Sequence, residues 1–201
     1  IIHLPMKTLT FTAAFVFASL ACSGQSIKPI QLSAPDMGRE VTLMQAFADR
    51  KSTREFSPEM LSLQELSDLL WAANGINRPD GKRTAPSAMN RQDIDIYVCT
   101  KEGAYLYDHK KHSLEPVTDQ DIRTLKKAPV CLILVANGSG NEAWSAMDAG
   151  IVSQNISLFC AGAHLATVPR GSMDADAIGK ALKLSAKQKP LLNHPVGYFK
   201  K

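Results

Sequence analysis

The chain is organised around one short stretch, Arg50-Lys51-Ser52-Thr53-Arg54-Glu55-Phe56. Three cations and two hydroxyls fall within its first five residues, between Phe47 and Phe56. The planar fork of an arginine matches a phosphate bidentately, a lysine adds a point charge, and serine or threonine donates from a short side chain. The stretch therefore predicts an anion site. A charge run this short is also typical of a solvated helix end, with Arg54 paired to Glu55 or Glu59.

The length and composition of the chain predict one globular domain. It has 201 residues, 45% of them hydrophobic, which is enough to bury a substantial core. Basic residues exceed acidic ones only slightly, 23 against 19, and so small an excess does not favour nucleic acid as a partner. It is compatible with a small anionic ligand.

Residues 1–24 are interpreted as preceding the fold. Residues 1–5 lie upstream of Met6, which we interpret as the start, and residues 9–21 form a short apolar run that ends in small residues. This pattern is typical of a secretory signal peptide, and the run is too short to span a bilayer. The alternative is a buried N-terminal helix. We therefore expect export to the periplasm or cell envelope, a mature domain at 25–201, and Cys22 as a candidate for lipid attachment.

Four cysteines occur in the chain. Cys22 belongs to the leader, Cys99 and Cys131 fall in apolar strand-like runs, and Cys160 falls in an apolar helix. No CxxC or Cys/His spacing suits a metal. We interpret the last three as core residues, and a disulfide between Cys99 and Cys131 stays open in an oxidising compartment.

Two helices are expected after a proline-containing arm at 27–40. The first should begin near Thr42 and end near Asp49, so the cationic stretch leaves a helix terminus. The second opens with a capping box at residues 62–65 and should stop in a left-handed conformation at Gly75. Trp71, between these ends, either belongs to the core or lines a ring-binding cleft.

The remaining elements alternate irregularly. A long loop ends in Pro86-Ser87-Ala88-Met89-Asn90 and runs into a strand at 94–98, and a hairpin follows at 104–108 and 113–117. Residues 129–136 read as a strand covered on both faces, and 141–163 as a long helix, apolar nearly all round and hence buried. A turn at 169–174, a helix to 184 and a strand near 196–199 complete the order. Without regular βαβ units, the order favours the α+β class.

Four of these features, in this order, resemble the nitroreductase family of FMN-dependent oxidoreductases, in particular its short branch related to thiazoline and oxazoline dehydrogenases. They are the cationic stretch, the loop at 86–90, the turn at 169–174 and the terminal Val196-Gly197-Tyr198-Phe199. The likeness covers about residues 42–199. It implies a three-layer sandwich with a central mixed or antiparallel sheet, a buried central helix and an intertwined homodimer with shared FMN sites.

The resemblance also implies which residues meet FMN. Arg50, Lys51, Ser52 and Arg54 match the segment that holds the phosphate and reaches the pyrimidine edge of the flavin. Pro86, Ser87, Ala88 and Asn90 match a loop lent by the other subunit to the isoalloxazine. Pro169, Arg170, Gly171 and Ser172 match a turn whose backbone approaches the ring near its reactive nitrogen. Family members commonly place a further cation near the C-terminus, for which Lys200 and Lys201 are the candidates.

The function expected from this resemblance is FMN-dependent oxidation and reduction. A hydride would pass from NADH or NADPH through the flavin to a small acceptor of the nitroaromatic or quinone type. No catalytic side chain, triad or metal-ligand set can be assigned from the sequence. Two alternatives stay open: a flavin-dependent dehydrogenase of a heterocyclic or peptide substrate, and an exported flavin-binding protein without turnover.

Overall fold

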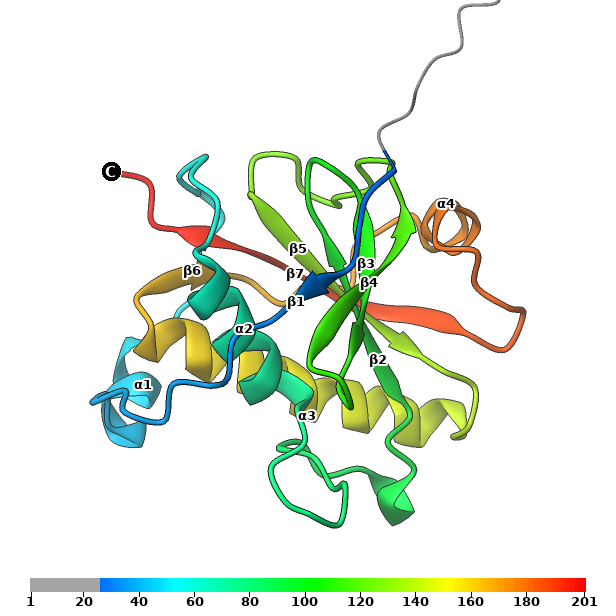
Figure 1. Ribbon diagram of the computed structural model, residues 1–201, viewed down its shortest axis with the longest axis horizontal. Coiled ribbons are helices and arrows are strands. Elements are labelled where there is room, and N and C mark those ends of the chain that lie inside the picture. The colour runs from blue at the N-terminus through cyan, green and yellow to red at the C-terminus, as the bar shows by residue number, and fades with distance from the viewer. Residues whose placement is uncertain (1–25) are drawn as a thin grey trace, which may run out of the picture.

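A seven-stranded sheet forms the centre of the computed structural model, which describes residues 26–201 (Figure 1). The leader expected at 1–24, with Cys22, lies outside the described residues. The strand order is β1-β4-β3-β2-β5-β7-β6, and neighbouring strands pair antiparallel throughout. The strands are β1 (Ile30–Gln31), β2 (Ile94–Cys99), β3 (Ala104–Asp108), β4 (Ser113–Thr118), β5 (Val130–Ala136), β6 (Leu165–Thr167) and β7 (Lys189–Tyr198).

Helices cover both faces of this sheet. They are α1 (Leu43–Asp49), α2 (Leu63–Asn74), the short 3-10 helix η1 (Ala88–Asn90), α3 (Glu142–Gly162) and α4 (Ala175–Ala181). Because side chains alternate along a strand, Ile94, Ile96 and Val98 of β2 join the core under α2 and α3. Tyr97 and Cys99 join a second core under α4. The predicted α+β class and three-layer arrangement are confirmed.

The long helix α3 is buried on one side only within a single chain. Its buried side carries mostly small or polar residues, among them Ser145, Asp148 and Ser153. Of its large apolar residues, Val152 and Ile156 are buried, whereas Trp144, Met147 and Ile151 are exposed. Part of the apolar character predicted from the sequence therefore belongs to a surface that the sheet does not cover.

Helix α2 begins as predicted and ends differently. Ser62 and Glu65 form the expected capping box, each accepting from the backbone N–H of the other. Gly75 was expected in the left-handed region, and this is wrong because its φ is −78°. Glycine is needed there for space, since a Cβ would lie 2.6 Å from Trp71 Cδ1. The Trp71 ring packs there because its Nε1 donates to Ile76 O at 2.9 Å.

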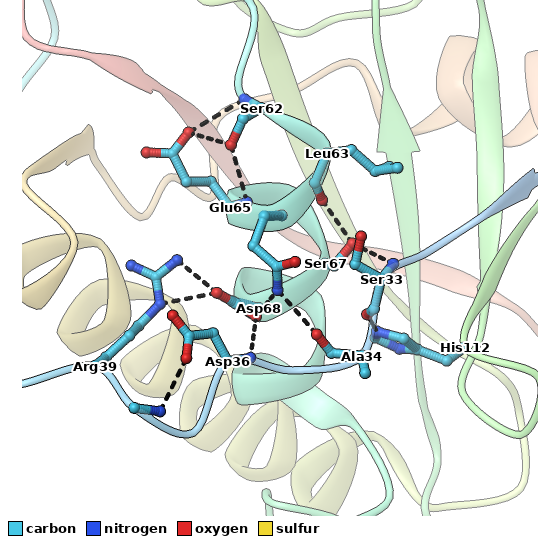
Figure 2. Close-up of polar contacts among 12 residues, drawn as sticks. Ser33, Ala34, Asp36, Arg39, Ser62, Leu63, Glu65, Ser67, Asp68 and His112 are labelled. Carbon is cyan, nitrogen blue, oxygen red and sulfur yellow. Dashed lines mark hydrogen bonds and ion pairs between the residues drawn. The ribbon is translucent and has the colours of Figure 1, made fainter.

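The arm before α1 is attached to α2 by polar contacts, which Figure 2 shows. The buried Asp68 accepts from Arg39 Nε and from the backbone N–H of Asp36, both at 2.8 Å. Ser67 Oγ accepts from Ser33 N at 3.0 Å, and Gln64 Nε2 donates to Ala34 O at 2.9 Å. The arm therefore runs across α2 on a fixed path and delivers the chain to α1.

The three cysteines of the described part of the chain are free and buried, which confirms their interpretation as core residues. Cys99 and Cys131 lie opposite each other on β2 and β5 without forming a disulfide. None of the helices formed by residues 26–201 combines the length and the apolar character that a membrane span requires.

Candidate functional site

The cationic stretch crosses one edge of the sheet immediately after α1. Thr53 N donates to Thr167 O of β6 at 2.8 Å, and Ser57 N donates to Tyr198 O of β7 at 2.9 Å. Phe56 is buried and forms a backbone bridge with Phe199. The stretch, the end of β6 and the chain after β7 therefore meet at one edge of the sheet.

A cavity of about 440 Å³ opens at this meeting point. Arg50 and Lys51 are exposed at its rim, and Lys51 Nζ lies 5.4 Å from the centroid of the Phe199 ring. Polar groups from α3 and β6 complete the wall. The lining residues are Ala48, Asp49, Arg50, Lys51, Ser157, Ala161, His164, Leu165, Thr167 and Phe199.

The cations of the stretch form no ion pair with the rest of the described part of the chain. Glu55 pairs with Lys127, which lowers the pKa of Glu55 through a hydrogen bond and through charge. Within residues 26–201, no carboxylate forms an ion pair with Arg50, Lys51 or Arg54. The alternative in which Arg54 pairs with Glu55 or Glu59 is therefore not observed. Arg50 and Lys51, which line the cavity without an ion-pair partner among these residues, are donors of the kind that bind a phosphate group.

The turn at 169–172 continues directly from β6. Arg170 N and O exchange hydrogen bonds with Asn193 O and N, at 2.9 and 2.8 Å, which fixes the turn against β7. Pro169, Gly171 and Ser172 are exposed, and a Cβ on Gly171 would meet no atom within 4 Å. The backbone of the turn is thus open to a flat ligand.

The side chain of Arg170 points elsewhere. Together with Arg123 and Thr124 it lines a separate cavity of about 440 Å³ beside α4, and its Nη1 is buried without a hydrogen-bond partner. Arg170 therefore contributes its backbone to the edge where Thr167 lies, and its guanidinium to a different surface.

The loop at 86–90 lies apart from this edge. Ala88 N donates to the carboxylate of Asp148 on α3, whereas the cavity contacts α3 at Ser157 and Ala161. At a rise of about 1.5 Å per residue, Asp148 and Ser157 are about 14 Å apart along the helix. Within one chain, the cavity at the first predicted segment and the anchor of the loop with Pro86, Ser87, Ala88 and Asn90 therefore lie on different parts of α3. The turn at 169–172 begins two residues after Thr167, which lines the cavity, and its Arg170 and Ser172 line the separate cavity beside α4.

A buried polar group that the sequence did not reveal supports the edge from beneath. His194 is 0% exposed, with Nε2 at 2.8 Å from Ser153 Oγ and Nδ1 at 3.3 Å from Thr167 Oγ1. Burial lowers the pKa of His194 to about 4, so the imidazole is neutral. Thr167 also donates to Pro195 O at 2.9 Å. These contacts fix the end of β6, where the Thr167 carbonyl accepts a hydrogen bond from Thr53 N.

Metal chemistry finds no support in the described residues, because no three His, Cys, Asp or Glu side chains of 26–201 gather in an arrangement that could hold an ion. The two histidines of the β3–β4 turn make polar contacts with other side chains instead. His112 contacts Tyr107, and His109 contacts Arg83, both at 2.9 Å.

Comparison with known proteins agrees with this geometry. Residues 47–198 match the model of the nitroreductase family. A protein from Methanocaldococcus jannaschii, whose name provisionally assigns it to the nitroreductases, is 32% identical over 193 residues. The match covers 84% of this chain and 96% of that protein.

Solved structures give the same result. One from Ralstonia eutropha JMP134, also provisionally named a nitroreductase, has a TM-score of 0.83, 34% identity and 98% coverage of both chains. An FMN-dependent nitroreductase from Clostridium difficile R20291 has a TM-score of 0.56 and 20% identity, covering 79% of this chain and 88% of that one, which shows the fold alone. Fold and site together define an α+β protein with a cationic cavity at one edge of its sheet. The chain belongs to the nitroreductase family, as its sequence motifs predicted.

Proposed function

We propose that this protein binds FMN and passes a hydride from NADH or NADPH, through the flavin, to a small acceptor of the nitroaromatic or quinone type. The observation that carries the proposal is that Arg50 and Lys51 line a cavity, and form no ion pair among residues 26–201, in a chain of the nitroreductase family. An FMN-dependent nitroreductase has the same fold. When bound, the flavin supplies the redox chemistry, and the protein positions it and sets its electrostatics.

The residues at the edge fit an anionic, flat ligand. In the proposed complex, Arg50, Lys51, Ser52 and Arg54 hold the phosphate and the pyrimidine edge, and the backbone at 169–172 approaches the ring. Lys200 is the proposed further cation, because it lies close enough to lower the pKa of Glu55, although less than Lys127 does. Cations near the pyrimidine edge stabilise negative charge that develops there.

We also propose that two chains share each site. The loop at 86–90 is anchored about 14 Å further along α3 than the cavity, and in this proposal a second copy supplies that loop to the flavin. Exposed apolar residues on two helices offer the surface for such pairing: Leu43, Met44 and Phe47 on α1, and Trp144, Met147 and Ile151 on α3. Export, with a leader at 1–24 and Cys22 as a candidate lipid site, is part of the same proposal.

Anaerobic titration tests the function. The protein, incubated with FMN and freed of excess, should be yellow, and its flavin absorbance should bleach when NADH or NADPH is added. Comparing the two donors identifies the preferred one. A coloured protein that neither donor reduces would contradict the oxidoreductase proposal and favour flavin binding alone, while a colourless protein would contradict both.

Site assignment is tested by charge removal. Arg50→Ala and Arg54→Ala should each weaken FMN binding by about tenfold to a hundredfold, since a charge-assisted hydrogen bond contributes about 1.5–3 kcal/mol. Lys110→Ala removes an exposed cation from the β3–β4 turn and is the matched control. Equal FMN affinity in all three variants, measured by flavin fluorescence, would show that the cavity at this edge is not the phosphate site.

A further inference from the structure

A buried asparagine on β7 holds the turn at 169–172. Asn193 is 0% exposed, and its Nδ2 donates to Arg170 O at 2.9 Å and to Ser172 O at 3.3 Å. Its Oδ1 accepts from Thr124 Oγ1 at 2.7 Å. A carbonyl oxygen can only accept a hydrogen bond, so the amide nitrogen of Asn193 has to face the turn. The side chain therefore has one orientation, in which it joins two carbonyl groups of the turn to the sheet.

Arg170 continues the antiparallel ladder between β6 and β7. Thr167 lies opposite Val196. Arg170, three residues further along, lies opposite Asn193, three residues earlier on β7, so the register is unbroken between the two pairs. Both backbone groups of Arg170 bond to Asn193, at 2.9 and 2.8 Å. Because residues of such a ladder alternate between facing the neighbouring strand and facing away from it, Gly171 faces away.

The N–H of Gly171 is consequently directed to the outer edge of the sheet. Every peptide bond in the described part of the chain is trans, so this N–H is opposite in direction to the C=O of Arg170 in the same planar unit. Two donors of Asn193, its N–H and its Nδ2, hold that C=O toward β7, and β6 is the last strand of the sheet. No backbone group of residues 26–201 accepts from Gly171 N, and a Cβ on Gly171 would meet no atom within 4 Å. The N–H is therefore open to a ligand.

The cationic stretch lies along the same outer edge. Thr167 O faces this edge, since it accepts from Thr53 N at 2.8 Å. Gly171 is four residues beyond Thr167, an even number, so its N–H faces the same way. At about 3.3 Å per residue, the two positions are about 13 Å apart. The Gly171 N–H and the cavity lined by Arg50 and Lys51 therefore open on one edge of the sheet.

We propose that Asn193 is a positioning residue for the flavin ring: its amide holds the turn against β7 and so directs the Gly171 N–H to an acceptor atom of the ring. This role rests on the proposed function, in which the turn approaches the flavin. An N–H that is fixed before the ligand arrives needs no reorganisation, so it stabilises the negative charge that the ring gains on reduction. Asn193 itself is buried and acts only through the turn.

Amide hydrogen exchange of the flavin-free protein tests the hold on the turn. Asn193→Ala keeps the backbone bridge to Arg170 and removes both side-chain donations, so exchange at the Arg170 N–H should become about tenfold faster. Asn74→Ala is the matched control, because Asn74 of α2 is also a buried asparagine, whose Nδ2 donates to Ile94 O at 2.9 Å. It should leave the Arg170 rate unchanged. Equal Arg170 rates in wild type and Asn193→Ala would overturn the proposal.

The reduction potential of bound FMN tests the role of the N–H. In Asn193→Ala, the ratio of reduced to oxidised flavin at a given potential should fall about tenfold, which for a two-electron couple is a midpoint about 30 mV more negative. Asn74→Ala should keep the wild-type midpoint. A residue that only stabilised the fold would change the amount of flavin-loaded protein and not its midpoint. An unchanged midpoint in Asn193→Ala would therefore overturn the positioning role.

Thr124→Val replaces Asn193→Ala in both measurements if that variant does not fold. It removes the hydroxyl that fixes Oδ1 of Asn193 and leaves the asparagine in place, so both changes should keep their direction and be smaller. Wild-type values in both measurements would then overturn the proposal.

The two measurements separate this role from the proposed function. A protein that binds no FMN would contradict the proposed function, and exchange at the Arg170 N–H would then decide alone whether Asn193 holds the turn. FMN bound with the wild-type midpoint in Asn193→Ala would support flavin binding and contradict the role of Asn193 in it.

Discussion

His194 occupies the point where α3, β6 and β7 meet, and its ring contacts bind these elements together. Neither Ser153 nor Thr167 carries charge, so a protonated imidazole there would have no counterion among its hydrogen-bond partners. Burial accordingly lowers the pKa of His194 to about 4, against about 6.5 for an exposed histidine. Because the pKa of His194 differs between the folded and the unfolded chain, the free energy of unfolding depends on pH.

The first prediction concerns this link. Between pH 6.5 and 4 the unfolded chain binds a proton at this position that the folded chain does not. The free energy of unfolding should therefore fall as the pH is lowered through this range, by at most about 3 kcal/mol from a shift of about 2.5 units. His194→Gln should show a flatter dependence in urea titrations at pH 4 to 7.

His164→Gln is the control, since His164 is exposed. Half-buried His109, whose pKa is also lowered to about 4 by burial and by Arg83, titrates in all three proteins and cancels in the comparison. Parallel stability curves for wild type and His194→Gln would contradict the prediction.

Residues whose role depends on their neighbours in the sequence were predicted well. Thr42, Ser62, Asn141 and Asp174 all accept from the backbone N–H three residues on, as helix-capping side chains do. His194 gave no such signal, because its partners Ser153 and Thr167 lie 41 and 27 residues away in the sequence. A buried polar residue is recognised by its partners, and these depend on tertiary structure.

At the scale of elements, the arm at 32–40 depends on α2. Asp68 accepts four hydrogen bonds, two from Arg39, one from Asp36 N and one from Gln64 Nε2 (Figure 2). Arg39 in turn lies over the ring of Phe159, 5.2 Å from its centroid, so the arm also contacts α3. The path of the arm determines where α1 begins, and α1 delivers Arg50 to the edge of the sheet.

The second prediction is that Asp68→Ala lowers the free energy of unfolding by about 2 kcal/mol, because buried donors lose their acceptor. The value stays below that for a fully buried ion pair, since the side chain of Arg39 is 33% exposed and regains water. Asp80→Ala is the matched control: its pair with Lys82 is half exposed on both sides and should contribute much less to stability. Equal losses in urea denaturation would contradict this.

Elements were predicted where the pattern is uninterrupted. The apolar run of β5 and the hairpin of β3 and β4 were found within one residue of their observed ends. Strand β7 was predicted only near 196–199 and in fact begins at Lys189, because Pro190, Asn193 and Pro195 interrupt its apolar pattern. Asn193 lies in the strand because its side chain bonds Arg170 O and Thr124, contacts that no local pattern reveals. Helix α4 ends at Ala181, three residues earlier than predicted, because Leu182 and Lys183 form a tight turn instead.

For the whole molecule, sequence patterns identified the segments of the proposed site but not their arrangement. Thr53 of the cationic stretch is bonded to Thr167 at the end of β6, and Arg50 and Thr167 line one cavity, while Ala88 is attached to the opposite half of α3. A single chain therefore holds two parts of the proposed site in different places. The apolar surfaces of α1 and α3 remain uncovered in that chain, which agrees with pairing of two copies.

The third prediction follows from this arrangement and is made for the proposed homodimer. Met147 lies on the uncovered side of α3 with 66% of its surface exposed, and Met147→Glu would place a carboxylate at the contact between two copies. Burying an unpaired charge is costly, so the dissociation constant of the dimer should rise by about a hundredfold or more, equivalent to about 2.7 kcal/mol. FMN should be lost in the same variant, because each proposed site needs the loop at 86–90 of the other copy.

Ala175→Glu places the same charge on α4, on the opposite face of the sheet, and should change neither property. Sedimentation velocity over a concentration series, with flavin absorbance recorded in the same cells, measures both. A Met147→Glu protein that sediments as a dimer would show that Met147 is not at the contact between copies, and one that dissociates yet keeps its FMN would show that the two copies do not complete each other's sites.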